Sequence, residues 1–214
     1  QAQKVDFFIA NSKEVQARIK KFYRRDVRVI YPPVELPQIA SVKRGNYYFI
    51  VARIVGGKGL RLAVEAAQRR NIQLKIAGVA TGYYTEYKEL SKQAKRNVEF
   101  LGYVTDEELA RLYGGAKAFL ALSTDEDFGI TPVEAMLCGT PVIAYDGGGY
   151  RETVVNGKTG VFFKEATEES LIDAIDRLET LNINPQDCID QAEKFSKERF
   201  KREIKQFVEK LTKQ

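Results

Sequence analysis

The stretch "YYFIVARIVGGKGL", residues 47–60, passes from an aromatic and β-branched run through a Gly-rich turn into a helical pattern of apolar residues. The same order of strand, Gly-containing turn and helix recurs along the chain. Because the runs are apolar on both faces and alternate with helices, they predict an α/β fold with a Rossmann-like, doubly wound parallel sheet. The predicted strands are Tyr47–Ala52, Ile72–Gly78, Val98–Gly102, Lys117–Leu122, Pro141–Tyr145 and Gly160–Phe163. The predicted helices are Leu60–Arg70, Thr85–Lys95, Asp106–Gly114, Pro132–Leu137, Gly149–Val155 and Glu168–Leu181.

Two further pieces flank this unit, so we predict three regions along the chain. Residues 1–37 contain the strand runs "VDFFIA" and "VRVIYPP" around a basic helix opened by Ser12, and "YPPVELPQ" follows as a Pro-rich linker. Residues 38–184 form the sheet domain, and residues 185–214 form a helical tail. Because the front piece is too short to close a sheet of its own, we expect it to be the trailing edge of an N-terminal domain.

The composition is that of an ordinary globular protein, with 214 residues and 44% hydrophobic content, enough to bury a full core. Apolar runs fall short of the roughly 18–20 residues that a membrane span needs, and the first residues lack the layout of a signal peptide. We therefore expect a cytoplasmic protein. The two cysteines, Cys138 and Cys188, lack CxxC spacing, which argues against a metal or redox role.

The net charge of +5 comes from one segment, Lys13–Arg28, which contains seven Lys and Arg residues against two acids. Val15, Ile19 and Phe22 fall on one face of the helix predicted here, with basic residues around them. Such a helix could lie peripherally on an anionic membrane surface at the inner face. Alternatively, it packs its apolar stripe on the core and leaves a solvated basic face. Nucleic acid is not an expected partner, because aromatic interleaving and a binding motif are both missing.

The turn after the first strand of the sheet predicts a phosphate site. In "VARIVGGKG", Arg53 leaves the strand and Lys58 opens the helix, while Gly56, Gly57 and Gly59 let backbone N–H groups approach a ligand. In an open parallel sheet, ligands bind outside the carboxyl ends of the strands, where this turn lies. The turn is neither a Walker A motif nor GxGxxG, so an exposed turn with ordinary basic residues remains the alternative.

A second turn, "STDEDFGITPVE" at residues 123–134, carries the carboxylates of Glu126 and Glu134 around a Phe-Gly pair. Thr131, Pro132 and Glu134 fit the N-cap, N1 and N3 positions of a helix, so we expect a capping box. Capping does not explain Glu126, which would repel the neighbouring acids unless cations or hydroxyl groups lie opposite. We expect Glu126 to accept hydrogen bonds from a ligand, with Glu134 available for either task.

A third turn, "AYDGGGYRE", contains Gly147–Gly149, which would let the chain pass close either to a ligand or to the sheet. The pattern of the sequence favours neither alternative. Taken together, the cations, N–H groups and carboxylates of the three turns suit a sugar diphosphate.

These motifs resemble the retaining glycosyltransferases of the GT-B fold, and most closely family four, which includes mannosyltransferases, glycogen synthases and sucrose synthases. The resemblance runs from about Asp6 to Leu178 and rests on Arg-x(4)-Lys, on Glu-x(7)-Glu with Phe-Gly inside, and on "ANS", "VIYPPVE", "FLGYVTDEEL" and "GTPVIAYDGGGYRETVVNGKTGVFF". It implies that the sheet is the C-terminal, donor-binding half of a GT-B fold. The implied substrate is a nucleoside diphosphate sugar carrying a hexose, such as GDP-mannose or a UDP-sugar.

The resemblance also implies which residues carry the reaction, a transfer with retention. Arg53 and Lys58 would grip the diphosphate and stabilise the charge that develops on it as it leaves, while Glu126 would hold the transferred sugar. Asp125 and Asp127 look like a DxD metal site, but such enzymes usually work without metal and their cations already occupy the phosphate position. We expect neither a metal nor a cofactor.

The remaining donor-binding residues are implied in the same way. Glu134 would hold the ribose hydroxyls, and the amides of Phe128 and Gly129 would help Glu126 to bind the sugar. The implied set is completed by Val104 and Asp106 beside the base, and by Gly57 and Ile130.

The chain departs from the family's pattern, because the acceptor domain and its usual active-site His are missing and the chain contains no His. We therefore expect the donor-binding portion of a longer transferase, inactive without its N-terminal domain. The alternative is a free-standing nucleotide-sugar-binding module or subunit without catalysis. An NAD-linked or phosphoacceptor domain fits less well, since the glycine fingerprint and the acidic cluster of those folds are missing.

Overall fold

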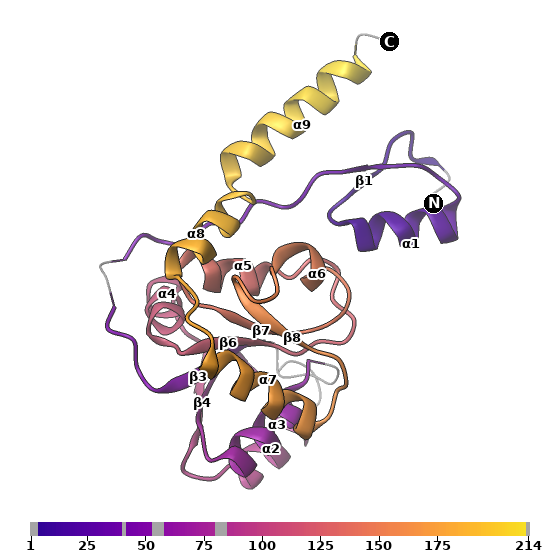
Figure 1. The fold of residues 1–214 in the computed structure, drawn as a ribbon. Coiled ribbons are helices and arrows are strands. Elements are labelled where there is room, and N and C mark those ends of the chain that lie inside the picture. The colour runs from indigo at the N-terminus through magenta and orange to yellow at the C-terminus, as the bar shows by residue number, and fades with distance from the viewer. Residues whose placement is uncertain (1–3, 40–41, 53–57, 80–84, 213–214) are drawn as a thin grey trace.

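The structure is a computed structural model that describes residues 4–39, 42–52, 58–79 and 85–212. A parallel six-stranded sheet forms its centre (Figure 1). The strands are β3 (Tyr47–Val51), β4 (Gln73–Ala77), β5 (Val98–Gly102), β6 (Ala118–Ala121), β7 (Val142–Tyr145) and β8 (Gly160–Phe163). Their spatial order is β5-β4-β3-β6-β7-β8. The sequence-based prediction of a doubly wound α/β sheet is therefore confirmed.

Helices cover both faces of the sheet, because successive side chains of each strand point to opposite faces. Ile50 and Ile76 belong to a core shared with α2 (Leu60–Arg70), α3 (Thr85–Gln93) and α7 (Glu168–Thr180). Phe49 and Ala77, next to them in the strands, belong to a second core. That core is shared with α4 (Asp106–Gly115), α5 (Ile130–Leu137), α6 (Tyr150–Thr153) and α8 (Pro185–Glu193). Burial on both faces explains why the strands are apolar throughout.

A separate two-stranded parallel sheet lies near the N-terminus, where β1 (Ile9–Ala10) pairs with β2 (Arg28–Val29). The helix α1 (Lys13–Tyr23) connects them, and the Ser12 hydroxyl caps it as predicted by accepting from the Val15 amide at 3.0 Å. The two strands are shorter than the predicted runs. In the second run, Pro32 and Pro33 have no N–H to donate to a ladder.

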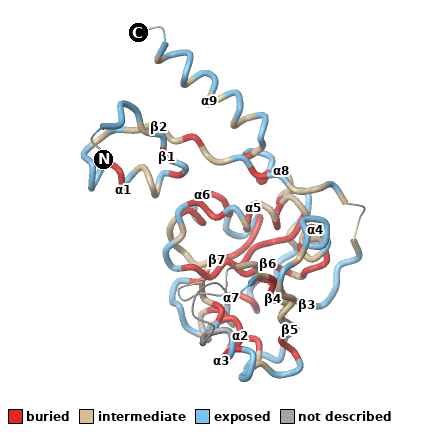
Figure 2. Tube along the Cα trace, turned by 180° about the vertical axis from the view of Figure 1, so that it is seen from behind, coloured by how far each residue is buried: buried red, intermediate tan, exposed pale blue. Residues whose placement is uncertain are grey.

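The last helix, α9 (Lys197–Leu211), extends away from the sheet (Figure 1). Figure 2 shows it largely exposed, and none of its described residues is buried. Its start is tied to the segment after β2, because the Arg199 guanidinium donates to the carbonyls of Tyr31 at 2.8 Å and Pro32 at 3.3 Å. The tail is thus helical, as predicted, and only its first helix joins the core.

The pairing of β3 with β6 places two strands side by side that are distant in the sequence. Tyr48 lies opposite Ala118 and Phe49 lies opposite Phe119, and the order of the strands reverses at this pair. The turn after β3 leads to α2 on one face of the sheet, whereas the turn after β6 leads to α5 on the other. The chain therefore leaves these two strands toward opposite faces, which opens a crevice at their carboxyl ends.

Gly59, which precedes the first residue of α2, lies against the end of β6. Its φ is 72°, and an added Cβ would lie 2.5 Å from the Leu122 Cβ and 2.9 Å from the Leu122 carbonyl oxygen. Backbone conformation and space thus both favour glycine at this position.

Replacing Gly59 by Ala should destabilise the protein more than replacing Gly157 by Ala. Both glycines have a positive φ, 72° and 76°, but a Cβ on Gly157 would meet no described atom within 4 Å. The left-handed conformation should cost both variants about 1–2 kcal/mol, and the contact with Leu122 should cost Gly59→Ala a further 1–3 kcal/mol or so. Urea unfolding of both variants measures the difference. Equal losses would show that the contact relaxes without cost.

Candidate functional site

A cleft of about 400 Å³ lies at the crevice between β3 and β6. Lys58 borders it from the turn after β3, and the loop 122–129 after β6 borders it together with the first turn of α5. Tyr150 of α6 contributes to the same wall, as do Asn11 and Pro32 from the N-terminal segment. Residues of both the sheet domain and the N-terminal segment therefore line the cleft.

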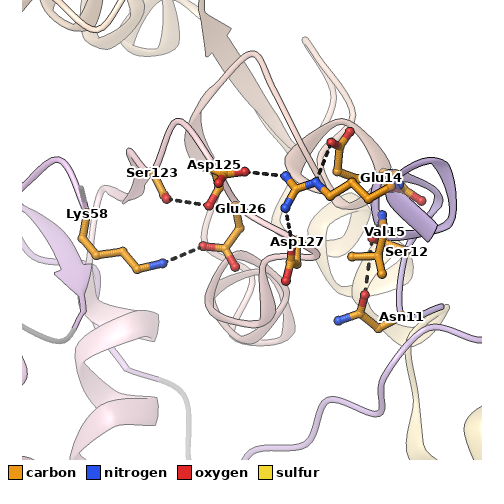
Figure 3. A network of polar contacts seen from close by, with 11 residues as sticks. Asn11, Ser12, Glu14, Val15, Lys58, Ser123, Asp125, Glu126 and Asp127 are labelled. Atoms are coloured by element: carbon orange, nitrogen blue, oxygen red, sulfur yellow. Dashed lines mark hydrogen bonds and ion pairs between the residues drawn. The ribbon is translucent and has the colours of Figure 1, made fainter. Parts of the chain in front are cut away.

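A cation and a carboxylate face each other across the cleft. The Lys58 Nζ lies 3.2 Å from the Glu126 Oε2 (Figure 3), and the two side chains are 31% and 25% exposed. The structure thus brings together two of the three residues predicted to be catalytic. The third, Arg53, lies outside the described residues, as does Gly57.

The loop that carries Glu126 is packed tightly against the Gly147–Gly149 turn. The Gly149 amide donates to the Glu126 carbonyl at 2.8 Å. A Cβ on Gly148 would lie 2.3 Å from that carbonyl oxygen, and a Cβ on Gly149 would lie 2.4 Å from the Phe128 Cα. Gly148 and Gly149 thus pack against the loop that carries Glu126, which is neither the ligand nor the sheet of the two alternatives left open for these glycines.

The predicted capping box at Thr131 and Glu134 does not form, so this prediction is wrong. The helix α5 begins two residues earlier than predicted, at Ile130, after Gly129 with a φ of 87°. The left-handed glycine turns the chain directly into the helix, and Pro132 then occupies the third helical position, where an N–H is not needed. Gly129 has no side chain to cap the first turn. The amino end of α5 consequently faces the cleft.

Glu134, which does not take part in a capping box, contacts a buried tyrosine. The Tyr113 hydroxyl donates to the Glu134 Oε2 at 2.8 Å. Burial raises the pKa of Glu134, the hydrogen bond from Tyr113 lowers it, and the negative charge of Asp106 raises it. Glu134 and Asp106 therefore lie close enough to interact, although neither borders the cleft of loop 122–129.

The other predicted donor-binding residues occupy varied positions. Ile130 is 46% exposed beside the cleft, whereas Phe128 is 2% exposed and its ring packs on Tyr31 and Phe195. For Phe128, only the backbone can face a ligand. Val104 packs at the edge of the second core. Asp106 is the first residue of α4, which the neighbouring Thr105 and Glu108 cap reciprocally.

Sequence reasoning missed Arg18 of α1 as a neighbour of the site. Its guanidinium donates to Asp125, and to the Asp127 Oδ1 at 2.9 Å, so the carboxylates that look like a DxD metal site accept from a cation of the chain itself. Nothing in the local pattern indicates this contact, because 107 positions separate Arg18 from Asp125. Tyr150 was also missed, although its position after three glycines could have indicated a residue near the loop.

Of the predicted apolar stripe on α1, Ile19 is buried but Phe22 is 70% exposed. The helix thus uses only part of that face for packing, and Lys20 and Lys21 are exposed beside Phe22. Contact with an anionic membrane stays a prediction for this end of the helix. Within the described ranges, the helices are too short or too polar to traverse a bilayer.

Comparisons with known proteins identify the family of the chain. Residues 34–195 match the family described as "Glycosyl transferases group 1". Mouse α-1,3/1,6-mannosyltransferase ALG2 is 35% identical over 247 residues, covering 96% of this chain and 59% of the relative. Glycogen synthase of Thermus caldophilus is 33% identical over 168 residues, covering 76% and 35%. The chain therefore spans from about a third to three fifths of the length of these curated relatives.

Two solved structures have a similar fold. HepE from Anabaena, in complex with UDP and glucose, superposes with a TM-score of 0.86 at 23% identity, covering 96% of this chain and 63% of that one. Sucrose-phosphate synthase from Thermosynechococcus elongatus gives 0.84 at 22% identity, covering 98% and 59%. At these identities the similarity concerns the fold.

Replacing Glu134 by Gln should change how stability depends on pH. Burial raises the pKa of Glu134 above 4.5 in the folded protein, so the folded state retains the proton to a higher pH than the unfolded chain does. This contribution to the free energy of unfolding is therefore present at low pH and is lost as the pH rises from about 4.5 through the folded pKa. The Gln variant has no carboxyl group at this position, so its free energy of unfolding should not show this decrease.

Urea unfolding between pH 4 and pH 8 measures the effect as the difference between the two proteins. Tyr113→Phe is a useful companion, because it removes the hydrogen bond that lowers the pKa and should extend the loss to higher pH. Parallel pH curves for wild type and Glu134→Gln would contradict the environment derived for this carboxylate.

Proposed function

The chain belongs to the group 1 glycosyltransferases, and from this premise we propose that its cleft binds a nucleoside diphosphate sugar. It would serve as the donor-binding portion of a retaining hexosyltransferase of family four. The observation that carries the proposal is the meeting of Lys58 and Glu126 across the cleft, at 3.2 Å, beside the amino end of α5. A cation, a carboxylate and helix amides together match the phosphates and hydroxyls of an activated sugar.

The diphosphate would lie against the amino end of α5. The amides of its first turn and the Lys58 ammonium group both favour negative charge there, and Arg53 would add a second cation. The fold similarity to HepE supports this choice of ligand, since that protein was crystallised with UDP and glucose. The base, guanine or uracil, would lie beside Val104 and Asp106.

The sugar and the ribose would each be held by one carboxylate. Glu126 would accept from the hydroxyls of the transferred hexose, helped by the amides of Phe128 and Gly129. The ribose would extend beyond the cleft of loop 122–129 and donate to Glu134. Transfer of a mannose or a glucose agrees with relatives that are named mannosyltransferase and glycogen synthase. The donor site needs no metal under this proposal, because Lys58 and Arg53 neutralise the diphosphate.

The reaction would proceed with retention, the acceptor attacking on the face from which the diphosphate leaves. Charge develops on the leaving diphosphate, and the fixed cations stabilise that charge more strongly in the transition state than in the ground state. We propose that transfer also needs an N-terminal acceptor domain beyond these 214 residues. The length of the relatives supports this, since the chain covers 59% of the mannosyltransferase.

Lys58→Ala should weaken nucleotide binding by roughly 10- to 100-fold, because a hydrogen bond to a charged group contributes about 1.5–3 kcal/mol. Titration calorimetry with GDP, UDP, GDP-mannose and UDP-glucose measures the loss. Lys117→Ala is the matched control. Lys117 is 35% exposed and paired with Glu179 at 2.6 Å. It directly precedes β6, so it lies at the amino end of that strand, whereas the cleft lies at the carboxyl end.

Undiminished binding by Lys58→Ala, or an equal loss in Lys117→Ala, would contradict the phosphate assignment. The same titrations in the presence of EDTA should give unchanged affinities. A strict requirement for Mg²⁺ or Mn²⁺ would instead move Asp125 and Asp127 into the site.

The chain alone should bind the donor and transfer no sugar. An open cleft leaves the leaving group solvated and holds no oriented nucleophile. Incubation with labelled GDP-mannose or UDP-glucose and candidate acceptors should give background transfer, and fusion to the N-terminal domain should restore it. In that fusion, Glu126→Ala should lower turnover more than it lowers affinity for the nucleoside diphosphate. Repeatable transfer by the chain alone would refute the need for a second domain, and no transfer by the fusion would favour a non-catalytic binding module.

A further inference from the structure

Arg18 uses all three nitrogens of its guanidinium on carboxylates. Its Nη1 donates to the Asp127 Oδ1 at 2.9 Å, its Nη2 donates to Asp125, and its Nε donates to the Glu14 Oε1 at 3.2 Å. Asp125 and Asp127 are the two chain neighbours of Glu126. One planar cation from α1 therefore holds the loop on both sides of the carboxylate that faces Lys58.

The side chains in this loop point in two directions (Figure 3). Asp125 and Asp127 are directed to the side of Glu14 and Ser12, whereas Glu126 points the other way, toward Lys58. Without a cation between the two aspartates, three consecutive carboxylates would repel one another in the loop. Arg18 offsets that repulsion, and Glu126 is the carboxylate of the three that pairs with Lys58.

The helix that carries Arg18 is itself anchored to the sheet domain at a second point. Glu152 of α6 accepts from the amides of Lys13 and Glu14, at 2.9 Å and 3.1 Å, and from the Tyr31 hydroxyl at 2.9 Å. A carboxylate at the amino end of a helix is favoured by the helix dipole. The position of α1, and with it that of Arg18, is therefore defined relative to the cleft.

We propose that Arg18 is a positioning residue for the donor site, which acts through Asp125 and Asp127 to hold Glu126 in place for the sugar. The proposal rests on the proposed function. Through Arg18, the position of the β1–α1–β2 unit would also affect the geometry of the cleft, because a displacement of α1 would remove the guanidinium from Asp125 and Asp127. A purely stabilising role is a poor explanation for these contacts, since the Asp125 and Asp127 side chains are 78% and 55% exposed.

The test compares binding of a nucleotide with binding of the corresponding nucleotide sugar. Because Arg18 acts on the sugar-binding carboxylate, Arg18→Ala should weaken UDP-glucose or GDP-mannose binding by about 10-fold. Affinity for UDP or GDP should change by less than about 2-fold, since Lys58 still holds the phosphates. Arg18→Lys, which keeps the charge and loses the planar fork, should recover part of the difference.

Arg25→Ala is the matched control. Arg25 lies in the same N-terminal segment, but its guanidinium donates to the carbonyls of Val5 and Asp6 and stacks on Phe8. It should leave both affinities unchanged. In a background of Asp125→Asn and Asp127→Asn, Arg18→Ala should have little further effect, because the contacts through which it acts are already weakened.

Hydrogen exchange supplies a readout that needs no ligand. The amides of the loop 123–129 should exchange faster in Arg18→Ala than in the wild type or in Arg25→Ala. Unchanged exchange, equal losses for nucleotide and nucleotide sugar, or an undiminished effect of Arg18→Ala in the Asn background would each overturn the proposal. Failure of the wild-type chain to bind any of the four nucleotides would refute the proposed function instead, while the exchange result would still decide the role of Arg18.

Discussion

The parallel pairing of β3 with β6 is the constraint on which the rest of the structure depends. Four residues make that ladder, Tyr48 with Ala118 and Phe49 with Phe119. Because the chain winds in opposite directions from these two strands, their turns run to opposite faces and cannot fill the space between them. The approach of Lys58 to Glu126 over 68 positions of sequence follows from this geometry.

The fold could be predicted from the sequence because the signal is local and repeated. Runs such as "GVFF" and "VEFLG" are short, apolar and bounded by turns, and the structure forms strands over just these residues. The beginning of α5 could not be predicted in the same way. Thr131 and Glu134 fit a capping box in sequence, but the backbone of Gly129, with a φ of 87°, starts the helix earlier. That turn also packs closely on Tyr150, since a Cβ on Gly129 would lie 2.8 Å from a carbon of the Tyr150 ring.

The candidate site, too, could be predicted from the sequence only in part. Lys58 and Glu126 were predicted because each lies in a turn after a strand, where parallel sheets bind their ligands. The contacts of Arg18 with Asp125 and of Glu152 with the amino end of α1 join segments more than a hundred positions apart. Such contacts leave no periodicity or spacing in the chain. For the segment that supplies the net positive charge, the sequence therefore predicts either a membrane contact or a solvated basic face, whereas Arg18 is engaged with acids of the sheet domain.

The ion pair across the cleft has a consequence for how a donor would bind. Lys58 and Glu126 satisfy one another in the structure, so a free diphosphate must compete with the carboxylate for the ammonium group. A sugar that donates its hydroxyls to Glu126 would compensate that carboxylate for its lost partner and leave Lys58 to the phosphates. Under the proposed function, the two halves of the donor would therefore favour each other's binding. That advantage requires Glu126 to remain beside Lys58, and this is the position in which the contacts of Arg18 with the flanking aspartates hold it.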